Sequence, residues 1–214
     1  MWSVFINRHS EVHPFHFQDL LNLQDSELAK LRPFSASALL FAEVAPVVTV
    51  GRRQLQDSAE LLRLEALGVD LVSGERGGNE TWHGPGQWIG FVLTPLISFT
   101  GDAMGVRKAV YRILGYALEI AKLYEPSAHL REGPELGVWS PRGKLVSVGI
   151  KINRGYITSG FSLNCIPSKA AFLGIEPCGI KGAQPDFILG NLNATERERE
   201  FLKLPRLIHE EFSK

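Results

Sequence analysis

Two residues of this sequence have the chemistry of a nucleophile and of the cation that could activate it. Cys178 stands between Pro177 and Gly179, a setting typical of a loop, whereas Cys165 ends an apolar run and fits a buried structural cysteine. A free thiol has a pKa of roughly 8.5, so only a few per cent is thiolate at neutral pH unless a cation is close. Lys144 could supply that cation.

Lys144 begins an otherwise apolar run, Leu145-Val146-Ser147-Val148-Gly149-Ile150. Strict alternation predicts that Lys144 shares one strand face with Val146 and Val148. A lysine whose ammonium reaches solvent at a strand end is the explanation that composition favours. The spacing alone does not bring Lys144 to Cys178.

A glycine-rich segment, residues 76–87, could hold a ligand against the backbone. It contains four glycines in twelve residues, and glycine allows both positive φ and close approach of a ligand. The segment lacks the Gly-Lys-Ser/Thr ending of a phosphate loop and the GxGxxG spacing of a dinucleotide site. A tight loop between strands, with Arg76 and His83 as local hydrogen-bonding residues, is the alternative.

The bulk composition limits the possible functions. The chain has 214 residues, 44% of them hydrophobic, and a formal net charge of zero, which predicts one compact domain over residues 1–214. Zero net charge gives no support for nucleic acid or an anionic membrane as partner. The sequence has no run long enough for a membrane span, no secretory signal and no metal-ligand spacing, and two cysteines suit a reducing cytoplasm.

Hydrophobic periodicity predicts an α+β fold with a mixed or mostly antiparallel sheet flanked by helices. Four helices are expected at residues 15–31, 58–67 and 103–124 and after a capping box at Thr195 and Glu198, with Pro205 interrupting or restarting the last. Strands are expected at residues 2–6, 38–44, 47–50, 69–72, 88–93, 136–139, 144–152 and 156–163, the last two joined by a hairpin turn at residues 153–155.

Four segments together resemble the lipoyl(octanoyl)transferases in order and spacing. They are Arg76-Gly-Gly-x-x-Thr-Trp-His-Gly-Pro-Gly-Gln87, Gly143-Lys144-x-x-Ser147-Val-Gly149, Gly160-Phe-Ser-Leu-Asn164 and Pro177-Cys178-Gly179. The similarity runs from about Pro46 to Gly182. It departs at Ser159, where the family usually has histidine, and at Cys165, where it has valine.

The resemblance implies a fold shared with biotin and lipoate protein ligases and a catalytic domain without a cofactor or metal. It implies transfer of octanoyl from acyl carrier protein to Cys178, with Lys144 lowering the pKa of the thiol, and then to a lysine of a lipoyl domain. The expected acceptors are the lipoyl domains of 2-oxoacid dehydrogenase subunits and the glycine cleavage H protein. The acyl pocket is expected to be lined by Arg76, Gly77, Gly78, Asn79, Glu80, Thr81, Trp82, His83, Ser147, Val148, Gly149, Gly160, Phe161 and Ser162.

Three other functions remain compatible with the sequence. The first is an ATP-dependent lipoate or biotin protein ligase, which needs no cysteine nucleophile. The second is a cysteine hydrolase in which His83 serves Cys178 as base. The third is a non-catalytic module that binds an acyl chain or a carrier protein.

Overall fold

The structure, a computed structural model, describes residues 2–51, 62, 64, 66, 68, 70–74, 76, 77, 79–168, 172, 175, 180 and 182–214. Cys178 and Gly78 lie outside these residues, as does most of the helix predicted for residues 58–67. All the other predicted site residues are described.

The described elements follow the predicted order closely. The strands are β1 (Trp2–Asn7), β2 (Ser37–Ala42), β3 (Val47–Val50), β4 (Leu71–Ser73), β5 (Thr81–His83), β6 (Gln87–Pro95), β7 (His129–Arg131), β8 (Gly137–Trp139), β9 (Lys144–Asn153) and β10 (Tyr156–Asn164). The α-helices are α1 (Phe17–Leu31), α3 (Leu96–Thr100), α4 (Val106–Lys122) and α5 (Ala194–Phe212), and the 3-10 helices are η1 (Arg32–Phe34) and η3 (Gly133–Glu135).

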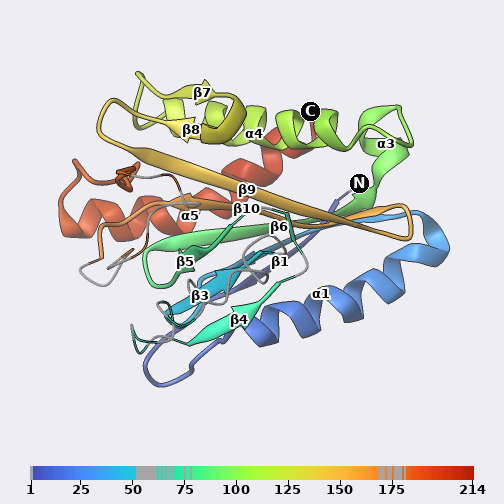
Figure 1. Ribbon diagram of the computed structural model, residues 1–214, viewed down its shortest axis with the longest axis horizontal. Helices are drawn as coiled ribbons and strands as arrows, with labels where there is room; N and C mark the ends of the chain where they lie inside the picture. The colour runs from blue at the N-terminus through green and yellow to red at the C-terminus, as the bar shows by residue number, and fades with distance from the viewer. Residues whose placement is uncertain are drawn as a thin grey trace.

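The strands form two sheets (Figure 1). The larger has seven strands in the order β1-β2-β6-β10-β9-β8-β7, in which only β1 and β2 are parallel. The smaller has the order β4-β3-β5, with β3 parallel to β4 and antiparallel to β5. The predicted α+β class with mixed sheets and flanking helices is confirmed.

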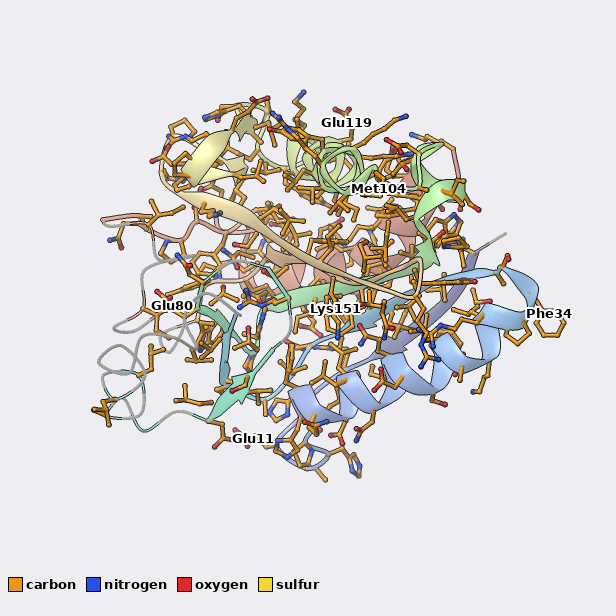
Figure 2. The ribbon with its side chains drawn as sticks, turned by 45° about the vertical axis from the view of Figure 1, so that its right-hand side comes forward. Glu11, Phe34, Glu80, Met104, Glu119 and Lys151 are labelled. Atoms are coloured by element: carbon orange, nitrogen blue, oxygen red, sulfur yellow. The ribbon has the colours of Figure 1, made fainter. Side chains whose placement is uncertain are left out.

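The large sheet is buried on both faces. Along β2, Leu39 and Phe41 belong to a core shared with α4 and α5, whereas Ala38, Leu40 and Ala42 belong to a core shared with α1. We call these the α4–α5 core and the α1 core. Figure 2 shows the layers, with Glu119 of α4 on one side, Glu11 before α1 on the other and Lys151 of β9 between them. None of the described helices combines the length and apolarity needed to cross a bilayer.

Helix α5 continues through Pro205, so the predicted interruption is wrong. Proline cannot donate a hydrogen bond to the carbonyl four residues earlier, which here belongs to Phe201. That carbonyl instead accepts the indole N–H of Trp88 at 2.9 Å. A partner from the sheet therefore replaces the missing helical bond.

Two other local predictions need correction. The capping box of α5 pairs Asn193 with Glu196 rather than Thr195 with Glu198. The glycine-rich segment is not a loop throughout, because it contains the strand β5, which pairs with β3. The small sheet thus brings His83 to the α1 side of the large sheet, where it stacks on Phe17, a contact that local sequence signals do not reveal.

Candidate active site

Strands β9 and β10 carry small residues at positions that pair across the two strands. Ser162 lies opposite Ser147, and two residues away Gly160 lies opposite Gly149. On its other side β10 pairs with β6, which places Ser162 opposite Ile89 of the α1 core. Residues directly opposite in an antiparallel pair share a face. The serines and glycines therefore face the α1 side, where missing side-chain bulk leaves a furrow in the sheet.

Three side chains cover this furrow and turn it into a pocket. Phe17 of α1 stacks on the His83 ring, with 5.3 Å between the ring centroids. Arg76 crosses above Gly149, since a Cβ added there would lie 3.1 Å from Arg76 Cδ. The pocket is lined by Phe17, Arg76, Thr81, His83, Ile89, Phe91, Ser147, Val148, Gly149, Ser159, Gly160, Phe161 and Ser162. Most residues predicted to bind the acyl chain thus meet around one pocket.

The remaining predicted binding residues have other surroundings. Gly77, Asn79, Glu80 and Trp82 do not line this pocket. Trp82 instead packs in a separate apolar cluster with Phe172, at a ring-centroid distance of 5.6 Å. Gly78 lies outside the described residues.

A β-bulge determines which way Lys144 points. Val138 of β8 lies opposite Val146, but Trp139 lies opposite Lys144, so Leu145 is the extra residue of β9. Both valines and Leu145 belong to the α4–α5 core. Trp139, one residue after Val138, takes the opposite face, and Lys144 shares that face. The prediction that Lys144 sits on the face of Val146 is therefore wrong, and Lys144 lies on the pocket face.

The side chain of Lys144 is enclosed, with 1% of the residue exposed. Its Nζ lies 5.4 Å from the centroid of the Trp139 ring, within the range of a cation–π interaction. No carboxylate among the described residues forms an ion pair with it. A buried ammonium without a carboxylate is suited to stabilising an anion that appears during a reaction.

Gly137 makes the space that Lys144 occupies. Its φ is +154°, and an added Cβ would lie 2.5 Å from the carbonyl oxygen of Val146 and 2.6 Å from Lys144 Cε. We expect Gly137→Ala to cost about 1–3 kcal/mol of stability and to slow acyl transfer at least about tenfold, because Lys144 must move. Melting curves and single-turnover rates measure the two effects. Gly115→Ala is the control, because its added Cβ meets no heavy atom within 4 Å apart from its chain neighbours and the backbone of its own helix; an equal loss in both variants would contradict the prediction.

His83 is held neutral in one tautomer. Burial lowers the pKa of His83 to about 3, against the effect of its hydrogen bond with Gln87 and with a smaller contribution from the Arg76 charge. The amide nitrogen of Gln87 donates to Asn164 and to the carbonyl of Trp82, so Gln87 Oε1 accepts from His83 Nδ1 at 2.6 Å. His83 Nε2 is left as an acceptor, 3.2 Å from the hydroxyl of Thr49.

The lowered pKa of His83 predicts a loss of stability in acid. Unfolded histidine has a pKa of 6.5, so between pH 6.5 and about 3 the unfolded chain binds a proton that the folded chain does not. The contribution is complete above pH 6.5 and declines as the pH falls through that window. Urea unfolding at pH 7 and pH 4.5 should show a smaller pH dependence for His83→Gln than for the wild type. An equal pH dependence of the two proteins would contradict the assignment.

Cys165 fits the structural role predicted for it. It is completely buried, its Sγ–H donates to the carbonyl of Leu163 at 3.1 Å, and burial raises the pKa of its thiol strongly. A thiol held in this way is a poor nucleophile at neutral pH.

Several residues that build the site could not be singled out from the sequence. Phe17, Ile89 and Phe91 line the pocket, yet in sequence they are ordinary core residues of a helix and a strand. Gln87 and Asn164 were part of the family segments but had no role assigned. The recurrence of small residues in two adjacent strands, Ser147-x-Gly149 and Gly160-x-Ser162, was the one available signal for the furrow.

The fold of the chain is that of the lipoate and biotin protein ligases. A lipoate protein ligase-like protein of Thermoplasma acidophilum, solved with bound lipoic acid, superposes with a TM-score of 0.64 over 97% of this chain and 86% of that chain, at 14% identity. A lipoate-protein ligase A solved with ATP gives a TM-score of 0.63 over 99% of this chain and 94% of that chain, at 11% identity. At such identities the likeness concerns the fold alone.

Sequence similarity defines the family. The model of the lipoyl protein ligase A/B catalytic domain matches residues 17–183. An octanoyltransferase of Geobacter sp. strain M21 is 30% identical, covering 87% of this chain and 85% of that protein. The human mitochondrial octanoyl-[acyl-carrier-protein]:protein N-octanoyltransferase is 32% identical, covering 78% of this chain and 75% of that protein. The chain belongs to the lipoyl protein ligase A/B catalytic domain family, which confirms the family and the acyltransferase class predicted from the sequence.

Proposed function

We propose that this chain transfers octanoyl from acyl carrier protein to a lysine of lipoyl-domain proteins through a thioester on Cys178. The observation that carries the proposal is the pocket: residues from β6, β9, β10 and the glycine-rich segment enclose an apolar furrow on the sheet face that also holds the Lys144 side chain. The two sequence relatives described above are named octanoyltransferases.

The described neighbours of Cys178 support its approach to Lys144. Ile180 lines a cavity together with Trp139 and Gly143, the residues opposite and directly before Lys144. Cys178 precedes Ile180 by two residues. Two extended residues span at most about 7 Å. A thiol next to the Lys144 ammonium is compatible with that constraint.

The proposed reaction balances protons between the two side chains. The Cys178 thiolate attacks the donor thioester, a new S–C bond forms, and the departing carrier thiolate takes a proton from the Lys144 ammonium. The neutral Lys144 amine then accepts a proton from the target lysine as that amine attacks the acyl-enzyme. The S–C bond breaks, and Cys178 returns to thiolate beside an ammonium. Backbone amides of the glycine-rich segment would bind the oxyanion.

Binding of the acyl chain supplies the free energy that a nearly balanced thioester exchange lacks. Burial of about six methylenes at about 0.8 kcal/mol each contributes about 5 kcal/mol. The pocket wall suits this, since Phe17, Ile89 and Phe91 are apolar and the glycines leave room for a slender chain.

The proposed donor is octanoyl-acyl carrier protein, and the proposed acceptors are lipoyl domains of 2-oxoacid dehydrogenase subunits and the glycine cleavage H protein. No ATP is consumed, because the thioester already carries an activated acyl group. We place the reaction in the cytoplasm, where the thiol stays reduced. The hydrolase alternative is disfavoured because both His83 ring nitrogens already have partners in Thr49 and Gln87.

Intact-mass spectrometry tests the proposal. The protein is mixed with octanoyl carrier protein in the absence of ATP, and a gain of one octanoyl group is expected, followed by its transfer to an added lipoyl domain. Free octanoic acid as the product would show a hydrolase. A requirement for ATP would show a ligase, and no added mass under either condition would show a binding module. Each of these three results contradicts the proposal.

A further inference from the structure

We propose that Gln87 and Asn164 are positioning residues, which hold the backbone of Lys144 at the bulge through one buried chain of hydrogen bonds. This inference rests on the proposed function, since it concerns how Lys144 is presented to the reaction. Neither residue lines the acyl pocket, so their action must pass through other groups.

The chain of bonds can be followed from the pocket to Lys144 with every donor assigned. Arg76 Nη2 donates to Thr49 Oγ1 at 2.8 Å, so the Thr49 hydroxyl directs its own hydrogen to His83 Nε2 at 3.2 Å. His83 Nδ1 donates to Gln87 Oε1 at 2.6 Å, and Gln87 Nε2 donates to Asn164 Oδ1 at 2.8 Å.

The last bond of the chain ends on the backbone of Lys144. Asn164 Nδ2 donates to the carbonyl oxygen of Lys144 at 3.0 Å, and the amide of Asp186 donates to the same oxygen at 2.9 Å. The amide of Lys144 itself donates to the carbonyl of Gln184 at 2.9 Å. Lys144 is thus fixed on one side by the segment that follows Ile180 and on the other by Asn164.

The hydrogen bond from Asn164 to the Lys144 carbonyl, which we call the anchor, lies where it can control the direction of the Lys144 side chain. Lys144 is the first residue of β9 and lies directly before the bulge, where the regular ladder to β8 is shifted. At a bulge the ladder of backbone hydrogen bonds is locally disrupted and the strand bends. The bond from Asn164 restrains the peptide whose orientation decides on which face the ammonium lies. Burial of Gln87 and Asn164, 1% and 4% exposed, keeps water from competing for these bonds.

Two isosteric substitutions remove the hydrogen bond between Asn164 and the Lys144 carbonyl, one by changing Asn164 itself and the other by changing its partner Gln87. Asn164→Asp can still accept from Gln87 but has no hydrogen for the Lys144 carbonyl. Gln87→Glu can accept from His83 but cannot donate to Asn164, so the Asn164 amide turns and presents its oxygen to Lys144. Gln18→Glu and Asn191→Asp add the same charge at exposed positions and serve as controls.

The experiment measures single-turnover acylation by octanoyl carrier protein across pH, together with alkylation of Cys178 across pH. Both variants should lower the maximal acylation rate about tenfold or more without weakening the apparent affinity for the donor, because the ammonium is misplaced while the pocket is intact. The pH midpoint of Cys178 alkylation should rise in both. The exposed controls should match the wild type.

Two results would overturn the inference: folded variants with the wild-type rate and alkylation midpoint, or variants that lose donor affinity while keeping the maximal rate. If neither variant folds, the wild-type protein decides the question. A through-bond NMR coupling between Asn164 Nδ2–H and the Lys144 carbonyl carbon must then be present, and its absence rejects the anchor. Failure of the proposed function differs from all of these, because then the wild type itself forms no octanoyl-enzyme.

Discussion

Cys178→Ala is expected to abolish formation of the octanoyl-enzyme and to lower transfer to a lipoyl domain by roughly 10⁴-fold or more. The reason is chemical: without the thiolate, the carrier thioester has no nucleophile next to the acyl pocket. Intact mass after mixing with octanoyl carrier protein measures the first effect, and the rate of octanoyl addition to the lipoyl domain measures the second. Cys178→Ser should also gain no octanoyl mass, because a serine hydroxyl is not ionised at neutral pH and would not attack the donor thioester to form an oxygen ester.

The chain contains a matched control for this substitution. Cys165→Ala removes the only other cysteine, which is buried and donates its S–H to a backbone carbonyl. It should keep the acyl mass and a rate close to the wild type, apart from the stability cost of a small cavity. If Cys178→Ala still gained octanoyl and Cys165→Ala did not, the assignment of the nucleophile would be reversed.

Lys144→Met has the second largest expected effect, a fall of about 10²- to 10³-fold in the rate of Cys178 acylation. Methionine fills the enclosed space beside Trp139 without the charge, so the acyl pocket and donor affinity should be preserved. Lys144→Ala should slow acylation similarly with an added loss of packing. Loss of the neighbouring cation should also move the pH midpoint of Cys178 alkylation towards roughly 8.5, the value of a free thiol.

Lys151→Met is the control for charge removal on the same strand. Lys151 lies seven residues after Lys144 on β9, beyond the residues of that strand that line the pocket. The Lys151→Met variant should keep a rate of Cys178 acylation and a pH profile of Cys178 alkylation close to those of the wild type. A Lys144→Met protein that was acylated at the normal rate and with the normal pH profile would remove Lys144 from the mechanism.

Local sequence patterns predicted several of the helices and strands of this protein. Helical periodicity predicted α1 and α4 to within a few residues, and the Asn153-Arg154-Gly155 turn predicted the β9–β10 hairpin. These elements depend on local periodicity and turn chemistry, which the sequence displays directly. The burial of Cys165 was likewise inferred from its immediate neighbours and is confirmed, whereas the loop expected around Cys178 stays a prediction.

Residue types and their immediate neighbours indicated the reactive groups: one thiol between a proline and a glycine, one lysine in an apolar run and two pairs of small residues that leave room for a chain. Only the tertiary structure showed how Lys144 and the small residues are placed relative to one another. The direction of Lys144 depends on a one-residue shift between β8 and β9, and the hydrogen-bond chain joins residues from Thr49 to Asn164. Register and buried hydrogen bonds are set by long-range packing, so neither is visible in alternation or spacing.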